Sequence, residues 1–268
     1  MLILQILLSG LAQGCIYGLV ALGFVLIYKA TETINFAQGE LMMLGAFLIW
    51  VLVDVMKLHF VLAVVMGILL MGALGWLLER MLLRPILGQP AFSVIMLTFG
   101  LGYMARGAIT MIPGVGTETH TLSLPYRNVM LRPGGLVLPA EQLVVIAATI
   151  ALVALLYLMF RFTRVGIAMQ AASQNQIAAY YMGIPVKRLN GLVWAMAAAV
   201  ATLAGLLLAP FTFVHVGMGF IGLKAFPAAV IGGFGSLPGA IVGGLVIGLI
   251  ESFAGFYLPG GFKDGAAH

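Results

Sequence analysis

Long apolar stretches separated by short polar turns run through nearly the whole chain. Each has roughly the 20 residues that an α-helix needs to cross the hydrocarbon core of a bilayer. This pattern predicts six ordinary membrane spans, at residues 2–28, 36–53, 60–83, 91–112, 141–160 and 191–210. The longest stretch between spans, residues 113–140, is rich in Pro, Gly and Thr and is expected to be a loop.

The pattern changes towards the end of the chain. Residues 222–235 are too short for an ordinary span, and Pro227 interrupts them. A turn at 236–239 follows, and then an apolar helix at 241–257. We predict a helical hairpin over 222–257 whose first arm is a half-helix. Irregular backbone at membrane depth is tolerated only where protein or a water-filled cavity covers it, so this hairpin is expected to form a wall of a substrate path.

Composition supports a membrane protein. Of the 268 residues, 63% are hydrophobic and 8% are charged, whereas soluble domains carry about 25% charged residues. The mean hydropathy is +1.16. The first apolar segment is too long for a cleavable signal peptide and is expected to be retained. The predicted fold class is an all-α, polytopic integral-membrane bundle of about seven or eight transmembrane helices and half-helices, in a single domain covering 1–268.

One segment, 161–190, is polar where its neighbours are apolar. Its middle, residues 170–176, reads QAASQNQ and is too polar to cross a bilayer. We predict a short helix that ends at Gly183, because glycine commonly follows a last helical residue and Pro185 cannot continue the helix. Basic residues at both ends of this segment favour a position at the cytoplasmic surface, where the helix would contact a soluble partner.

The placement of lysine and arginine predicts the topology, because these residues concentrate in cytoplasmic turns. With 161–190 inside, the turns at 29–35 and 80–90 are also inside. The 54–59 turn, the 113–140 loop and the N-terminus are then outside. Seven of the thirteen basic residues lie on the inside turns: Lys29, Arg80, Arg84, Arg161, Arg164, Lys187 and Arg188. The net charge of +5 reflects this topology, so the expected surroundings are a lipid bilayer and no nucleic-acid partner is expected.

The chain contains no motif for catalysis or nucleotide binding. The patterns GxSxG, HExxH and GxxxxGK[ST] are all missing from the sequence. We therefore expect no catalytic residues, no cofactor and no hydrolysis of ATP by this chain itself. The four histidines are scattered without metal-site spacing, and the single cysteine, Cys15, excludes an internal disulfide.

Three polar residues stand at the start of the second predicted span: Asn35, Gln38 and Glu40. One interpretation is that they line or gate the inner end of a substrate path, since ionisable groups near membrane depth are costly and often functional. The other is helix capping, with Asn35 as N-cap, Gln38 three residues on, and Glu40 near the positive helix end. The two interpretations are compatible.

Other charged residues interrupt apolar runs. Lys224 and Glu251 are candidates for the substrate path together with Phe226. Lys224 either pairs with Glu251 across the hairpin or, as we favour, extends to the outer membrane surface. Glu251 is expected to face protein or a cavity. Arg106 either holds Glu118 in the outer loop or, as favoured here, anchors the fourth span at the headgroups.

Three long motifs then suggest a family. Residues 14–28 read GCIYGLVALGFVLIY and lead into INFAQGELMMLGA at 34–46. Residues 222–240 read GLKAFPAAVIGGFGSLPGA, and Met-Gly-Ile at 182–184 ends the polar helix. In this order they closely resemble the first of the two permease subunits of bacterial branched-chain amino-acid ABC importers. The resemblance covers nearly the whole chain.

The resemblance implies an importer of the inner (plasma) membrane that works by alternating access. Its partners would be a second permease subunit, two cytoplasmic ATP-binding subunits and a periplasmic substrate-binding protein. The family's coupling helix, which sits in a groove on each ATPase, corresponds to residues 165–183. Its candidate contacts are Val165, Met169, Gln170, Gln174, Asn175, Tyr180, Tyr181 and Gly183. Because the middle of this helix is uncharged here, contact would depend on hydrogen bonds and on the Met and Tyr side chains.

Relatives continue past the position of residues 262–264 with one more spanning helix and a basic cytoplasmic end. This chain ends at 265–268, so we expect that last helix to be missing. The nearest alternative function is a related importer of urea, short amides or another amino-acid-like solute. A secondary transporter or channel is less favoured, because only Glu40, Glu251 and Lys224 could couple ions, and an intramembrane enzyme is disfavoured for want of paired catalytic groups.

Overall fold

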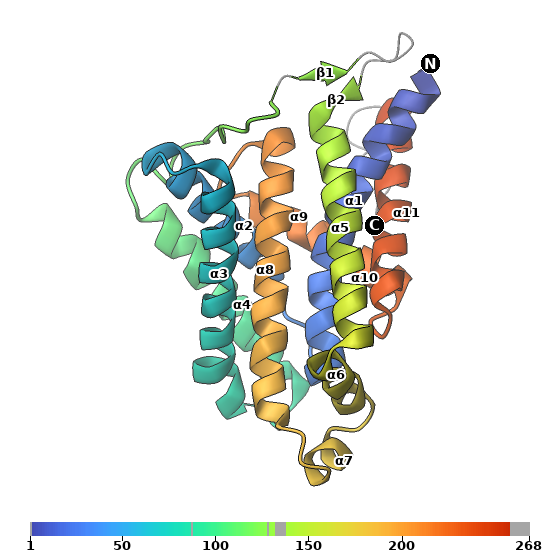
Figure 1. Ribbon diagram of the computed structural model, residues 1–268. Coiled ribbons are helices and arrows are strands. Elements are labelled where there is room, and N and C mark those ends of the chain that lie inside the picture. The colour runs from blue at the N-terminus through green and yellow to red at the C-terminus, as the bar shows by residue number, and fades with distance from the viewer. Residues whose placement is uncertain (1, 87, 128, 132–137, 258–268) are drawn as a thin grey trace.

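The computed structural model describes residues 2–86, 88–127, 129–131 and 138–257, and it is almost entirely helical (Figure 1). Seven helical stretches in this described part are long and apolar enough to cross a membrane. They are built on α1 (Leu2–Thr31), α2 (Gln38–Trp50), α3 (Phe60–Leu78), α4 (Ala91–Thr110), α5 (Ala140–Phe162), α8 (Val186–Thr212) and α11 (Leu237–Tyr257). The predicted all-α polytopic membrane bundle is therefore confirmed. The expectation about a missing last helix concerns residues outside the described part.

Shorter elements complete the bundle. Turns of π-helix extend α2 and α3, and a 3-10 turn follows the second of them. In chain order these elements are the turns Val51–Val55, Glu79–Leu83 and Arg84–Ile86, the strands β1 (Met130–Leu131) and β2 (Leu138–Pro139), and the helices α6 (Arg164–Gln174), α7 (Gln176–Tyr181), α9 (Met218–Lys224) and α10 (Phe226–Gly232). The two strands pair antiparallel in the loop before α5, with Met130 opposite Pro139.

Helix α1 lies in the middle of the bundle and packs closely against α11. The glycines spaced four apart on α1, at Gly10, Gly14 and Gly18, face α11, as the small-residue spacing predicts. A Cβ atom added at Gly14 would come within 2.7 Å of the Leu245 Cα. Gly248 of α11 faces Gly14 in return, so the two backbones are in direct contact. Any larger side chain at these positions would force the helices apart.

The C-terminal hairpin has the broken first arm that the sequence predicts, but its bounds differ. The arm consists of α9 and α10, with Ala225 between them and Pro227 in the first turn of α10, where proline is tolerated. Gly233, at φ 81°, ends α10, and α11 then begins at Leu237, earlier than the predicted residue 241. The arm is too short to cross a bilayer, and it packs along α11, where Gly243 fits against the Ala228 carbonyl.

The polar segment forms two helices, which corrects the prediction of one. Asn175 separates α6 from α7, and its Oδ1 accepts a hydrogen bond of 2.9 Å from the Ala178 N–H. Thr163 caps α6 in the same way, accepting from the Gly166 N–H at 3.0 Å. Short polar side chains compete for backbone N–H groups, so a cap at Asn175 starts a new helix in place of continuing the old one. Gly183, at φ 82°, ends α7 as predicted.

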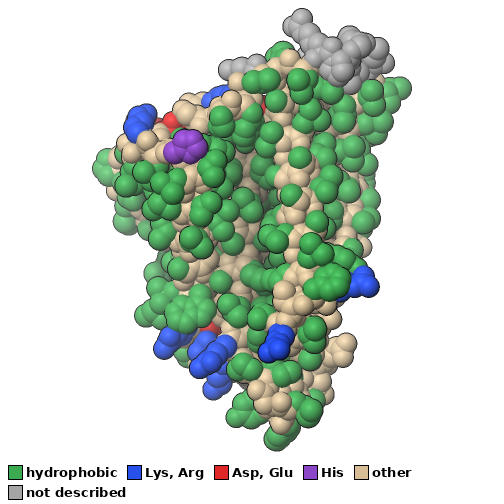
Figure 2. All heavy atoms as spheres, in the orientation of Figure 1, with side chains coloured by type: hydrophobic (Ala, Val, Ile, Leu, Met, Phe, Trp, Pro, Cys, Tyr) green, Lys and Arg blue, Asp and Glu red, His purple; other side chains and the backbone are tan. Residues whose placement is uncertain are grey.

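Charged side chains are concentrated at the two ends of the bundle. Figure 2 shows Lys and Arg side chains gathered around the end that carries α6 and α7, with an apolar tip beyond them. Between the two ends, the surface in this view is almost entirely hydrophobic. This distribution is the one that a bilayer selects, because charged groups favour its two aqueous interfaces.

Candidate functional site

A polar cavity of about 400 Å³ lies at the end of the bundle opposite α6 and α7. The N-terminal half of α1, the start of α5, the end of α8, and helices α9 and α11 enclose it (Figure 1). Six of its polar lining residues are Gln13, Tyr17, Gln142, Thr212, Lys224 and Glu251. We call it the Lys224–Glu251 cavity, because it brings the two charged residues of the hairpin to one space. Lys224 and Glu251 thus line one cavity, which agrees with the alternative that pairs them across the hairpin.

Glu251 is fixed in this cavity by α1. Its side chain is 2% exposed, and its Oε2 accepts a hydrogen bond of 2.5 Å from the Tyr17 hydroxyl. Gln13 donates in turn to the Tyr17 oxygen at 2.9 Å. Gln13 and Tyr17 lie four residues apart and therefore share one face of α1. Two polar residues four apart within an apolar helix are the sequence signal that could have identified Gln13 and Tyr17 as site residues.

An aromatic cluster surrounds the start of α10. Phe226, two residues after Lys224, has its ring centroid 5.8 Å from that of Phe24 and 5.6 Å from that of Phe36. Phe234 lies 5.7 Å from Phe226 and 4.8 Å from Tyr28. These rings come from α1, from the turn before α2, and from α10 and the loop that follows it. They meet in tilted and edge-to-face arrangements, which aromatic side chains favour. We call them the Phe226 cluster.

A second polar cavity, of about 410 Å³, lies where α6 meets the end of α1. Tyr28 and Phe234 of the Phe226 cluster line it, as do Gln170 and Gln174 of α6. We call it the α6 cavity. Two of the residues expected to form the coupling helix thus face a cavity of the bundle itself. The Phe226 cluster therefore contacts the α6 cavity through Tyr28 and Phe234.

The polar residues at the start of α2 form a buried network. Asn35 and Gln38 are both 0% exposed, and Gln38 donates to the Ala197 carbonyl of α8 at 3.2 Å. Helix α2 begins at Gln38 with Ala37 in the cap position, so Asn35 is not the N-cap that the sequence predicts. Its Oδ1 instead accepts from the Ala37 N–H at 3.1 Å. These side chains connect helices in the bundle interior.

Glu40 forms an ion pair with Arg106 of α4, and the expected roles of Arg106 are therefore wrong. Arg106 neither reaches Glu118 nor extends to the headgroups, because its guanidinium also lies over the Phe220 ring, 3.7 Å from the ring centroid. The Arg106 and Glu40 side chains are 16% and 14% exposed. The pair joins α2, α4 and α9. A partner 66 residues away could not be identified from spacing along the chain.

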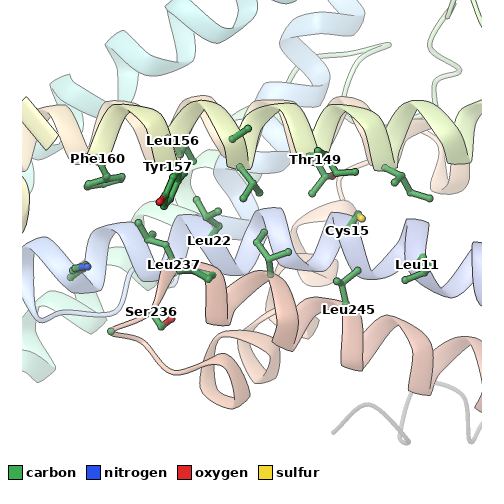
Figure 3. A pocket seen from close by; sticks show the side chains of 18 of the residues that line it. Leu11, Cys15, Leu22, Thr149, Leu156, Tyr157, Phe160, Ser236, Leu237 and Leu245 are labelled. Carbon is green, nitrogen blue, oxygen red and sulfur yellow. The ribbon is translucent and has the colours of Figure 1, made fainter. Parts of the chain in front are cut away.

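A third, larger hollow of about 770 Å³ runs between α1, α5 and α11 (Figure 3). Cys15 of α1 and Thr149 of α5 both point into it, among leucines such as Leu22 and Leu245. Its lining is mostly apolar, and its polar members include Lys29, Thr149, Gln170 and Ser236. Such walls offer hydrocarbon contacts and little polar recognition, so we do not assign the substrate to this groove.

The loop before α5 covers the bundle end that carries the Lys224–Glu251 cavity. The His120 ring stacks on Trp50 at 3.8 Å between centroids, and His120 and Val214 exchange backbone hydrogen bonds of 2.8 Å. Tyr126, further along this loop, packs edge-on against Phe60. Burial raises the pKa of the Tyr126 phenol to about 12, with a smaller contribution from the Glu141 carboxylate. This phenol therefore stays protonated at physiological pH.

At the opposite end, α7 presents apolar side chains to the surroundings. Ile177, Tyr180, Tyr181 and Met182 are 70%, 68%, 82% and 83% exposed. We call these four residues the α7 patch. Met169, one of the expected contact residues, is only 6% exposed and packs against the bundle, so it does not contribute to this surface. Val165, Gln174 and Asn175 are exposed as expected.

The spanning helices, the broken hairpin and the polar cavities near both ends define a multi-pass membrane permease. The sequence confirms the class: it matches the family described as branched-chain amino acid transport system / permease component over residues 6–261. This match covers most of the chain, and the chain belongs to that family.

Named relatives agree with this assignment. The high-affinity branched-chain amino acid transport system permease protein LivH of Escherichia coli strain K12 is 29% identical over 281 residues, covering 97% of this chain and 89% of the relative. The permease BraD of Pseudomonas aeruginosa is also 29% identical, with the same coverage of both chains. Among solved structures, PsaBC from Streptococcus pneumoniae in complex with Fab aligns with a TM-score of 0.51 and 14% identity, covering 97% of this chain and 87% of that one. This last likeness concerns the fold alone.

Proposed function

We propose that this chain is the transmembrane permease subunit of an ABC importer for branched-chain amino acids, located in the inner membrane with its N-terminus outside. The observation that carries the proposal is the family match over residues 6–261. Relatives named for high-affinity branched-chain amino acid transport, at 29% identity over 97% of this chain, support the substrate class. The concentration of basic side chains around α6 and α7 supports the orientation (Figure 2).

The proposed partners are a second permease subunit, two cytoplasmic ATP-binding subunits and a periplasmic substrate-binding protein. The chain has no nucleotide-binding motif of its own, so the energy for transport enters through a partner. The α7 patch supports an ATPase contact. Its side chains project beyond the basic residues, where the surroundings are aqueous, and exposed apolar side chains in water favour a protein partner.

The proposed mechanism is alternating access driven through α6 and α7. Gln176 donates to the Ala30 carbonyl of α1 at 2.6 Å, and Gln170 donates to the Phe160 carbonyl of α5 at 3.2 Å. A push from an ATPase on α7 therefore reaches α1 directly through Gln176 and reaches α5 through α6. Because α1 also contributes to the Phe226 cluster, its movement separates the rings and connects the Lys224–Glu251 cavity with the α6 cavity.

The test of the function is uptake by cells that lack their own branched-chain transporters and express this chain with its neighbouring transport genes. We expect ATP-dependent accumulation of radiolabelled leucine, isoleucine and valine. Uptake of urea or acetamide in their place would favour the alternative substrate class. Uptake that persists without the ATPase genes would favour a secondary transporter and contradict the proposal.

The coupling role is tested by replacing Tyr180, Tyr181 and Met182 with serine. We expect the variant to lose at least tenfold in ATPase recovered with a tagged permease in mild detergent, because the apolar contact is removed. The matched control replaces Met111 and Met130, which are 84% and 58% exposed near the opposite end of the bundle, with serine. Equal ATPase recovery from both variants and the unmodified chain would mean that α7 is not the coupling helix.

A further inference from the structure

The Lys224–Glu251 cavity combines features that a path for a small solute does not require. Its volume of about 400 Å³ falls within the range of about 300–1,000 Å³ that is common for small-molecule sites. It contains one ammonium group and one carboxylate, contributed by different helices of the hairpin, α9 and α11. A passive conduit would not need charges of both signs.

The hydrogen bond between Glu251 and Tyr17 does not by itself require a charge at position 251. One residue along α11, Ser252 already connects this helix to α1 by donating to the Ile6 carbonyl at 2.9 Å. A neutral side chain at 251 could accept the Tyr17 hydrogen bond equally well, without the cost of desolvating a carboxylate. Ionisable residues retained inside a membrane bundle commonly mark a site that binds or conducts a charged solute.

The rest of the lining contains both polar and apolar side chains. Gln13, Gln142 and Thr212 supply neutral hydrogen-bonding groups. The apolar lining residues include Ile16, Leu208, Phe211 and Ile221. A free α-amino acid has the matching chemistry, because its ammonium and carboxylate groups sit on one carbon and its side chain points away from both.

We propose that this cavity binds one α-amino acid as a zwitterion during transport, with Lys224 contacting the substrate carboxylate and Glu251 its ammonium group. The apolar lining receives the aliphatic side chain. This inference rests on the proposed function and adds a substrate-binding site to it. Phe226, which begins the aromatic cluster, follows Lys224 by two residues in the chain.

The experiment measures tritiated leucine binding to the purified permease–ATPase core in nanodiscs, by equilibrium dialysis, without the substrate-binding protein. Two competitors each lack one charge: 4-methylpentanoate has no ammonium group and 3-methylbutylamine has no carboxylate. For the unmodified core we expect unlabelled leucine to compete, and both analogues to compete at least tenfold more weakly. This comparison needs no variant and so does not depend on a variant folding.

The variants Glu251→Gln and Lys224→Met then remove one charge each. The glutamine keeps an acceptor for the Tyr17 hydroxyl, so a role of Glu251 in packing alone predicts unchanged leucine binding. We expect at least a tenfold loss of affinity in both variants. The control is Ser252→Ala, which removes a hydrogen bond between α11 and α1 outside the cavity and is expected to bind leucine within twofold of the unmodified core.

Leucine affinities within twofold of the unmodified core in both charge variants would overturn the site. So would equal competition by leucine and the two analogues, or a core that transports leucine but has no saturable leucine binding. A different result would contradict the proposed function itself: the complete importer would accumulate no branched-chain amino acid at all. Uptake by the complete importer is therefore measured alongside, and separates the two failures.

Discussion

Glu40 illustrates how the bundle accommodates an ionisable side chain among apolar ones. It pairs with Arg106, whose guanidinium also rests on the Phe220 ring. Within the described residues, one oxygen of Glu40, Oε2, and the Arg106 Nε have no hydrogen-bond partner. The pair is thus only partly satisfied, which makes it dependent on the close packing of α2, α4 and α9.

Removing the charge of one member of this pair is expected to lower the free energy of unfolding more than removing both charges. Glu40→Gln or Arg106→Gln leaves a largely buried charge without its counter-ion, and we expect each to lower the free energy of unfolding by about 3 kcal/mol. The double variant should recover at least half of that loss. Thermal unfolding in detergent, followed by tryptophan fluorescence, measures all three.

Glu118→Gln is the control for this cycle, because Glu118 is the partner that sequence spacing suggested for Arg106. It is exposed in the loop before α5, and its substitution should change stability by less than about 0.5 kcal/mol. Additive losses in the double variant would mean that Glu40 and Arg106 do not stabilise each other.

Among the described helices, α1 and α11 share the most extensive contact, and small residues allow it. A Cβ atom added at Gly244 or Gly248 would overlap the α1 backbone at Gly18 or Gly14. In a membrane, association of helices depends on such close packing because lipid tails are as apolar as the side chains. Movement of α1 is therefore transmitted to the hairpin that forms one side of the Lys224–Glu251 cavity.

Gly248→Ala should destabilise the permease, although alanine is the better helix former. The added methyl group forces α11 away from α1, and overpacking of this kind costs about 1–3 kcal/mol. Gly107→Ala in α4 is the matched substitution, since nothing lies within 4 Å of its added Cβ atom, and it should be neutral or slightly stabilising. A lower unfolding temperature for Gly107→Ala than for Gly248→Ala would contradict this account.

At the scale of the whole molecule, the two ends of the bundle differ in chemistry. One carries the basic side chains, the α6 cavity and the α7 patch. The other carries the Lys224–Glu251 cavity and the loop anchored by His120 on Trp50. This polarity agrees with the proposed function, in which the permease receives substrate at one face and contacts an ATPase at the other.

Cysteine labelling tests the orientation directly. The single native cysteine, Cys15, is 5% exposed and should not react, so introduced cysteines can be compared on the unmodified background. With a membrane-impermeant maleimide added to intact cells, we expect labelling of Met111→Cys, whereas Tyr181→Cys should react only after permeabilisation. The reverse pattern would place the N-terminus inside and contradict the proposed topology.

Much of this architecture could be read from the sequence because the bilayer imposes it locally. A spanning helix needs about 20 apolar residues whatever its neighbours are, so the spans, the broken arm with Pro227 and the polar segment before α8 were all predicted. The placement of basic residues follows from the same constraint. Local chemistry also determines that α7 ends at Gly183.

The contacts that make the site were decided only by the tertiary structure. Glu251 and Tyr17 are 234 residues apart, and Glu40 and Arg106 are 66 apart. Such contacts depend on how each helix is rotated about its axis and shifted along it. In a soluble bundle the hydrophobic periodicity would reveal that rotation, but here lipid and protein interior are equally apolar, so the sequence pattern carries little information about which face of a span is buried.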